Sequence, residues 1–194
     1  MKRHPLRLAI AVTLMLAGCV HRGPDTLNNY ETAGNLSPTR ALGCVGPHGV
    51  SSRDTPADLI PAMSLCVRDN NYHNALFLYA LSGAYSHFDV LRVVDHTAHD
   101  AGGLLLLQAI QSMSAAQRIS LQREIRHVFG SRRKTAIVCR KIENIGPPNY
   151  YPAYMINHGM NALARPQGSG LIRNFNPVSA WDEVLASYLH CSGT

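Results

Sequence analysis

Two histidines flanked by acids form the stretch in which residue type and spacing most favour chemistry, Asp95-His96-Thr97-Ala98-His99-Asp100. On a helix, His96 and His99 would lie one turn apart, so both imidazoles could reach one metal ion. A zinc site would also need a ligand from elsewhere. Three other histidines are available for this, namely His73, His87 and His158. A metal-dependent hydrolase that uses His96 and His99 is therefore one hypothesis.

The same stretch also fits the solvated polar face of an amphipathic helix. Asp95 with His99, and His96 with Asp100, would then be paired four positions apart. The metalloprotease motif of two histidines four residues apart with an intervening glutamate is absent from this stretch. We therefore favour the solvated face, expect no metal or other cofactor, and keep the metal site as the minority hypothesis.

Signatures of other chemistry are missing from the sequence. Gly168-Ser169-Gly170 lacks the spacing of a nucleophile elbow. We find no phosphate-binding loop, dinucleotide fingerprint or nucleic-acid motif. The formal charge of +6 includes three of the 18 basic residues in an N-terminal segment that we expect to be removed, which leaves 15 against 12 acidic residues. We therefore predict a binding protein, not an enzyme, with no nucleic-acid partner.

A basic stretch lies between Arg123 and Glu143. It contains two acids and seven basic residues, Arg123, Arg126, Arg132, Arg133, Lys134, Arg140 and Lys141. Such a cluster attracts anionic surfaces such as phospholipid headgroups, lipopolysaccharide, peptidoglycan or an acidic protein, and the alternative is a solvated face. We take Arg132, Arg133 and Lys134 as candidate partner-binding residues.

A loop rich in proline and tyrosine follows, Gly146-Pro147-Pro148-Asn149-Tyr150-Tyr151-Pro152, and continues to Tyr154. Tyrosines in a loop that prolines restrain offer large amphipathic side chains at low entropic cost, a composition typical of interface cores. Tyr150, Tyr151 and Tyr154 are therefore candidate partner-binding residues as well. The alternative is that these rings fold back on the core.

The N-terminus indicates where such a protein would be located. Lys2, Arg3 and Arg7 precede an apolar run over 8–16 that has the length of a signal-peptide core and is too short to span a bilayer. The run ends in Leu16-Ala17-Gly18-Cys19, which resembles the lipobox of bacterial lipoproteins.

The lipobox resemblance implies that Cys19 is lipid-modified and becomes the first residue of the mature chain. Val20 follows Cys19, in place of the aspartate that retains enterobacterial lipoproteins at the inner membrane, so the analogy favours the outer membrane, with the chain facing the periplasm. The alternative is a simple secretory signal with a fortuitous cysteine.

The remaining cysteines are an even set, Cys44, Cys66, Cys139 and Cys191. In an oxidising compartment two disulfides are the default expectation, and the sequence leaves three pairings open. We favour Cys44 with Cys66, which would hold an irregular N-terminal segment to the core, and Cys139 with Cys191, which would tie back the chain end.

The hydrophobic pattern predicts an all-α domain of about six helices over 53–194, preceded by a signal peptide over 1–18 and a lipid-anchored tether and loop over 19–52. Thr55 and Asp58 have the spacing of a helix start. A helical hairpin turns at Asp69-Asn70-Asn71, and its large and small residues alternate in a way that resembles a degenerate tetratricopeptide or Sel1-type unit of roughly 34 residues.

Further helices are expected downstream of the hairpin. A third one would run from Ser86 to Ala101, and an apolar one over 104–113 would be the most buried. The next would begin at Ser114 with a capping box and end at Gly130. The run over 135–139 is ambiguous between strand and helix, 152–165 should be one helix, and the last helix should open at Asn176-Pro177.

Three functions remain at this point. The favoured one is an outer-membrane-anchored periplasmic lipoprotein that acts by protein binding, as an envelope adaptor or assembly factor. The second is an immunity-type lipoprotein that neutralises a periplasmic toxin by covering its active site. The third is the hydrolase centred on His96 and His99.

Overall fold

The computed structural model describes residues 32–164 and 168–191 of the 194-residue chain. These residues form an all-α structure, as predicted, with an isolated β-bridge between Val93 and Leu171 and no longer strand pairing. Eight α-helices are present in the described part: α1 (Pro56–Arg68), α2 (Tyr72–Arg92), α3 (Ala101–Gln111), α4 (Ala115–Phe129), α5 (Arg132–Ile145), α6 (Ala153–Ile156), α7 (Met160–Leu163) and α8 (Pro177–Glu183).

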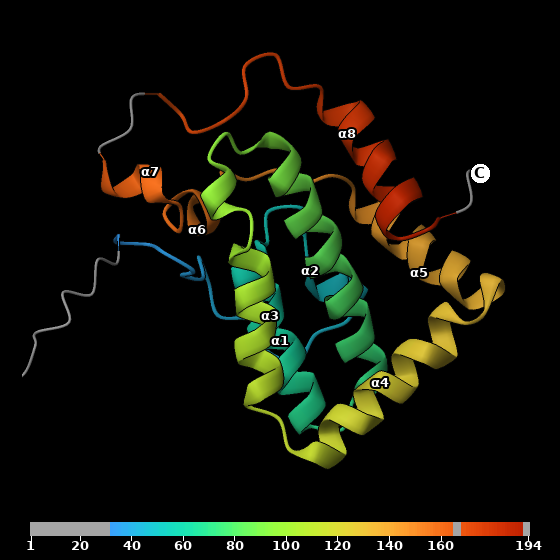
Figure 1. Cartoon of the computed structure of the whole chain (residues 1–194). Coiled ribbons are helices and arrows are strands. Elements are labelled where there is room, and N and C mark those ends of the chain that lie inside the picture. Colours follow the sequence, from blue (N-terminus) through green and yellow to red (C-terminus); the bar gives the residue numbers. More distant parts are fainter. Residues whose placement is uncertain (1–31, 165–167, 192–194) are drawn as a thin grey trace, which may run out of the picture.

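The predicted hairpin is the centre of the molecule, with α1 packed along α2 (Figure 1). The side chain of Thr55 accepts a hydrogen bond from the backbone N–H of Asp58, and the Asp58 carboxylate accepts one from the N–H of Thr55, which confirms the expected start. Pro61 lies inside α1 on its exposed side, where the carbonyl that loses its helical partner can be solvated. The inner faces of α1 and α2 supply most of the fully buried side chains.

The prediction of a separate third helix from Ser86 to Ala101 is wrong. Helix α2 continues without interruption past Ser86 to Arg92. The β-branched pair Val93-Val94 then leaves the helix. The N–H of Val94 donates to the carbonyl of Gly170, and the carbonyl of Arg92 accepts from the N–H of Ile172. The stretch 95–100 follows as a 3-10 turn that the Asp95 side chain caps by accepting from the N–H of Thr97.

The apolar helix α3 is less buried than expected. It packs through Leu105 and Ala109, whereas the side chain of Leu107 is 49% exposed. The reason is that α1 and α2 already fill the centre, so α3 covers only one side of them. Helix α4 begins with the predicted capping box at Ser114 and ends at Gly130.

The structure decides the segment 135–139, which the sequence left open between strand and helix, and corrects the single helix predicted over 152–165. The run over 135–139 is helical, because it lies within α5. The region 152–165 forms two short helices instead of one, α6 and α7. Gly159 separates them in an extended conformation at the N-cap of α7, where an added Cβ would collide with Asp95.

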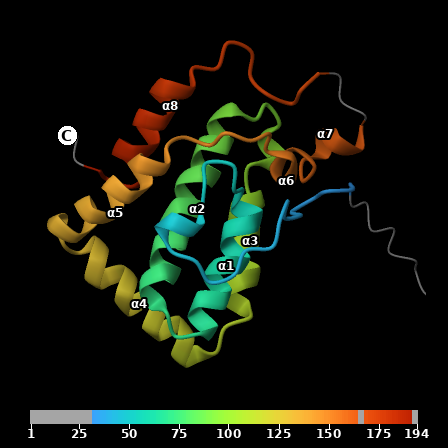
Figure 2. The ribbon, with the colours of Figure 1, turned by 180° about the vertical axis from the view of Figure 1, so that it is seen from behind.

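The described part of the expected tether and loop, 32–52, packs on the helices instead of standing apart from them (Figure 2). The buried carboxylate of Asp58 accepts hydrogen bonds from the backbone N–H groups of Thr39 and Arg40, at 2.6 and 2.9 Å. The Arg40 guanidinium donates two hydrogen bonds to the carboxylate of Asp54. The packed structure therefore begins before the predicted boundary at residue 53.

Both predicted disulfides are confirmed. Cys44 pairs with Cys66, which joins the N-terminal loop to α1 across a Cα–Cα distance of 4.6 Å. Cys139 pairs with Cys191, which joins α5 to the C-terminal turn, residues 184–191, across a Cα–Cα distance of 5.8 Å. As expected, the first bridge holds the irregular N-terminal segment to the helical core, and the second ties back the end of the chain.

None of the helices over the described residues is both long enough and apolar enough to cross a membrane. The expected signal peptide, its lipobox and Cys19 lie outside the described residues.

Candidate partner-binding site

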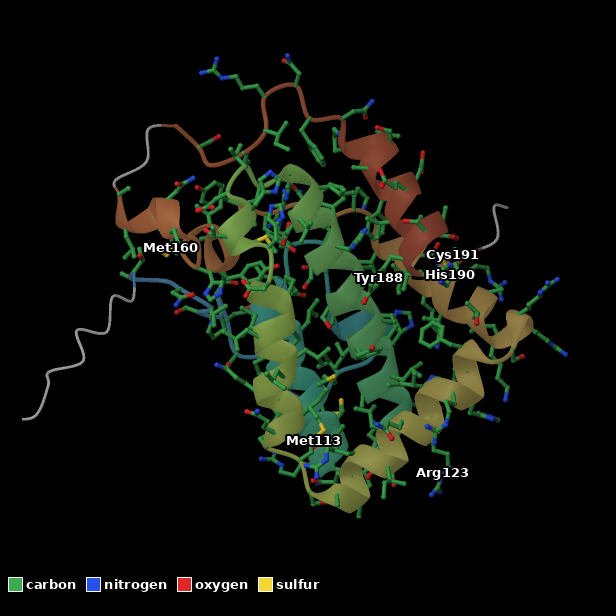
Figure 3. All side chains as sticks on the ribbon, in the orientation of Figure 1. Met113, Arg123, Met160, Tyr188, His190 and Cys191 are labelled. Carbon is green, nitrogen blue, oxygen red and sulfur yellow. A yellow bond between two sulfur atoms is a disulfide. The ribbon has the colours of Figure 1, made fainter. Side chains whose placement is uncertain are left out.

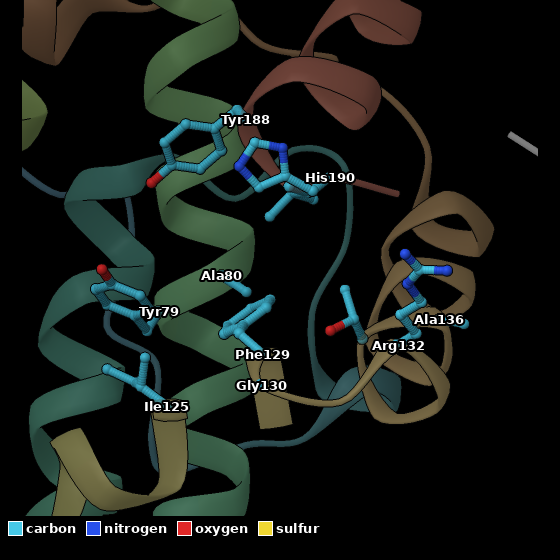
Figure 4. Close-up of a pocket in the computed structure, with 11 residues that line it drawn as sticks. Tyr79, Ala80, Ile125, Phe129, Gly130, Arg132, Ala136, Tyr188 and His190 are labelled. Atoms are coloured by element: carbon cyan, nitrogen blue, oxygen red, sulfur yellow. The ribbon is translucent and has the colours of Figure 1, made fainter. Parts of the chain in front are cut away.

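A pocket of about 500 Å³ lies where α2, α4, α5 and the C-terminal turn meet (Figure 4). We call it the C-terminal pocket. Its lining residues come from all four elements: Tyr79, Ala80, Ile125, Phe129, Gly130, Arg132, Thr135, Ala136, Tyr188, Leu189 and His190. The volume falls in the range of pockets that bind small ligands or single side chains of a partner.

The walls of the C-terminal pocket combine aromatic and aliphatic surface with polar side-chain groups. Arg132 and His190 are the basic side chains that line it, and no acid lines it among the described residues. Tyr188 is 39% exposed, and burial together with the nearby Tyr79 raises the pKa of its hydroxyl. The pocket is therefore complementary to an apolar group that carries a negative charge at one side.

Tyr188 is held in place by two contacts with α2. Its ring stacks on the imidazole of His87, with centroids 5.2 Å apart and an interplanar angle of 17°. Its hydroxyl lies against Gly83, where any added Cβ would collide with it. The glycine thus allows the tyrosine to lie flat on α2, which forms one wall of the pocket.

The C-terminal turn that carries Tyr188 and His190 has unusual backbone geometry. Residues Val184–Tyr188 form a π-helical turn, and His190 adopts a left-handed conformation with a φ of 54°. Both features are uncommon and recur at functional sites. The neighbouring Cys191 is bonded to Cys139 of α5, so the disulfide fixes the wall that these residues form.

The basic stretch is divided between α4 and α5, and only one of its three candidate residues enters the pocket. Arg132 lines the pocket, Arg133 is exposed beside it, and Lys134 is half-buried with its Nζ against the imidazole of His127. The stretch therefore forms a basic surround for the pocket, and one of its residues, the exposed Arg132, is part of the lining.

Two of the three candidate tyrosines point into the protein, toward Asp89. The hydroxyls of Tyr150 and Tyr154 each donate to Asp89 Oδ2 at 2.9 Å. Tyr154 is buried, and Tyr150 is half-buried under the guanidinium of Arg92, 5.1 Å from its ring centroid. Tyr151 is different, being 52% exposed with its hydroxyl donating to the carbonyl of Ser169.

Asp89 is fully buried, and its carboxylate accepts from both tyrosines and from Arg92 Nε, which lies 2.8 Å from Oδ1. Burial raises the pKa of Asp89 to about 6, while Arg92 and the two hydroxyls favour the charged form and limit the rise. Burial and the nearby Asp89 raise the pKa of Tyr150 and Tyr154 well above the ordinary value. This network fastens the loop after α5 to α2.

The structure does not bring the tyrosine loop and the candidate basic residues together. Arg132 begins α5, whereas Tyr150 follows the other end of this 14-residue helix. At 1.5 Å per residue the two ends lie about 21 Å apart. A contact surface that includes the basic residues is therefore built with Tyr79 and Tyr188 of the pocket, and Tyr151 is separate from it.

The two histidines of the metal hypothesis lie in the 3-10 turn, with ring centroids 4.8 Å apart. Because 95–100 is not an α-helix, the expected i,i+4 pairing of Asp95 and Asp100 with them is wrong. Asp95 instead accepts from Thr97 and from the backbone of Asn161. His99 Nε2 lies 2.9 Å from the carbonyl oxygen of Val93, a contact that requires the proton on Nε2.

Among the described residues, no group of three or more His, Cys, Asp or Glu side chains is placed to hold a metal ion. His73 lies near Lys141, and His87 stacks on Tyr188. His158 lies between Asp100 and Asn35.

The sequence analysis missed several residues of the C-terminal pocket and of the network around Asp89. Asp89 and Arg92 gave a signal that could have been used, since an acid and an arginine three positions apart stand in an otherwise apolar helix. The position of Tyr79 and Tyr188 at a pocket depends on four elements meeting. His190 carries no sequence signal.

No family model, curated protein or solved structure matches this chain.

Proposed function

We propose that the chain is a lipoprotein of the bacterial outer membrane, anchored through Cys19, and that it acts in the periplasm by binding a protein partner as an envelope adaptor. The N-terminal pattern ending in Leu16-Ala17-Gly18-Cys19 supports the anchor. Two disulfides support passage through an oxidising compartment.

The observation that carries the binding function is the C-terminal pocket, a cavity of mixed aromatic, aliphatic and polar lining with Arg132 at one side and a basic surround. We infer that it takes a segment of the partner that presents an aromatic or branched side chain next to a carboxylate. Burying such a side chain contributes about 1.5–3 kcal/mol. A carboxylate on Arg132 adds a charge-assisted, bidentate contact, which fixes the orientation of the segment.

The pocket is suited to recognition because its walls are fixed before the partner arrives. The disulfide holds the C-terminal turn to α5, and the stacking on His87 restrains Tyr188. Less conformational freedom is then lost on binding, which favours affinity for a given contact area. Tyrosine and arginine are also among the residues that most often dominate interface energies.

The test is capture of the partner from detergent-solubilised envelopes of the native cell, followed by binding measurements with the two purified proteins. Arg132→Glu should weaken the purified complex at least tenfold, because the pocket would then repel the carboxylate. Arg133→Glu is the matched control, since it makes the same charge change at an exposed neighbour that does not line the pocket.

Equal losses of affinity for the partner in the two variants would show that only the overall basic charge of this surface matters. They would refute the pocket as the contact site. Mass spectrometry of the N-terminal peptide tests the anchor separately, because the proposed chain begins with acylated Cys19. A captured partner that is a periplasmic toxin would favour the immunity-type alternative, which would use the same surface.

A further inference from the structure

Five large apolar side chains are exposed on the segments that meet near α7, beside a shallow cavity of about 280 Å³ that Val94 lines. We call them the α7 patch: Val94 (50% exposed), Tyr151 (52%), Met160 (63%), Leu163 (44%) and Ile172 (45%). A monomeric protein commonly exposes such residues singly, and a cluster of them marks a surface that meets something apolar.

Backbone and side-chain contacts join the segments that carry the α7 patch. The backbone N–H of Val94 donates to the carbonyl of Gly170, and the N–H of Ile172 donates to the carbonyl of Arg92. The N–H of Met160 donates to the hydroxyl of Thr97. The turn after α2, the helix α7 and the segment 168–173 therefore form one surface.

The described chain begins beside this surface. The side chain of Asn157 donates to the carbonyl of Ala33, and the N–H of Leu36 donates to the carbonyl of Tyr154, which places 33–36 against α6. Figures 1 and 2 both show this first segment next to α6 and α7.

The length of chain before this point limits where a membrane anchor can be. Only 12 residues, 20–31, separate Cys19 from Thr32. They reach at most about 45 Å when fully extended and about 20 Å as a flexible coil. A lipid on Cys19 therefore holds the bilayer within tens of ångströms of α6 and α7.

We propose that the α7 patch docks on the surface of the bilayer that holds the lipid of Cys19, which rests on the anchor proposed above. Met160, Leu163 and the neighbouring apolar side chains enter the boundary between headgroups and acyl chains, where Tyr151 is also favourably placed. Arg173 lines the same shallow cavity and meets lipid phosphate. The carboxylate of Asp95 lines the same cavity and carries a charge that disfavours contact with lipid. Its effect is small, because it already accepts hydrogen bonds from the hydroxyl of Thr97 and the N–H of Asn161.

Docking in this way orients the binding site. Figure 3 labels Met160 at one side of the molecule and Tyr188, His190 and Cys191 toward the other. With the α7 patch on the membrane, the C-terminal pocket is directed away from the lipid attachment and is free to meet a periplasmic partner. The membrane and the partner therefore use separate surfaces.

The experiment uses tryptophan quenching by lipid. Trp181 is the only tryptophan and is buried, so one exposed tryptophan can be added against a constant background. The acylated variants Met160→Trp and Val178→Trp are reconstituted in vesicles of phosphatidylethanolamine and phosphatidylglycerol with brominated acyl chains. Val178 is the matched control, because it is 69% exposed but lies on α8, outside the patch.

We expect the brominated lipid to quench the added emission of Met160→Trp at least twofold and to leave that of Val178→Trp unchanged. Equal quenching in both variants would overturn a fixed orientation. Absence of quenching in chains that float with the vesicles would overturn docking while the anchor stands, and would assign the patch to a second copy or to residues 20–31. Chains that carry no acyl group and do not float would refute the anchor, and the docking with it.

Discussion

The buried carboxylate of Asp89 should make the stability of this protein depend on pH in an unusual direction. Its ordinary pKa is 3.8, and burial raises it to about 6. Between these pH values the folded chain retains a proton that the unfolded chain has lost. The free energy of unfolding therefore contains a contribution from Asp89 that is complete below pH 4 and is lost as the pH rises through 6.

The size of this effect follows from the shift of about two pH units. Each unit corresponds to about 1.4 kcal/mol, so the contribution amounts to about 3 kcal/mol over the whole window. Most carboxylates act in the opposite direction, because partners in the folded state lower their pKa. Asp89 differs because removing its charge from water costs more free energy than its interactions with Arg92, Tyr150 and Tyr154 contribute.

The measurement is the free energy of unfolding in urea at several pH values between 3.5 and 7.5, for the wild type and for Asp89→Asn. The substitution has a fixed cost from the disturbed network, and this cost does not affect the slope. The difference between wild type and variant should fall with rising pH by about 3 kcal/mol, with its steepest part between about pH 4 and 6.

Tyr150→Phe is a useful second variant, because losing one donor to the carboxylate should raise the pKa of Asp89 further and extend the window upward. A difference between wild type and Asp89→Asn that rises with pH would refute the reasoning. It would mean that the ion pair with Arg92 outweighs burial and keeps the pKa of Asp89 below 3.8.

Three further outcomes are expected. Replacing Cys139 and Cys191 by alanine removes a bridge with a sequence separation of 52, so the free energy of unfolding in urea should fall by about 4 kcal/mol. Asp58→Ala leaves the backbone donors of 39–40 and the buried N–H of Thr55 without an acceptor, and should cost about 3 kcal/mol in the same assay, whereas a loss under 1 kcal/mol would contradict the network. Gly83→Ala should displace Tyr188 and weaken partner binding. The melting temperature should change little, because the stability that alanine adds to the helix offsets the stability lost with the packing of the Tyr188 ring. Unchanged affinity for the partner would exclude Tyr188 from the site.

Part of the candidate site could be predicted from the sequence, and part could not. Arg132 was a candidate because its charge stands in a basic stretch that the sequence displays directly. Tyr150 and Tyr154 were candidates by composition, but composition does not reveal whether an aromatic ring meets a partner or a buried acid. Asp89, far away in the sequence, decides this by accepting from both hydroxyls.

By itself, the sequence determined the all-α class, the capped starts at Thr55 and Ser114 and the end of α4 at Gly130, because each of these depends on contacts within one helical turn. Only the tertiary structure decided among the three cysteine pairings, moved 95–100 out of a helix and assembled the C-terminal pocket from four elements. These outcomes depend on which distant surfaces meet, and local spacing does not contain that information.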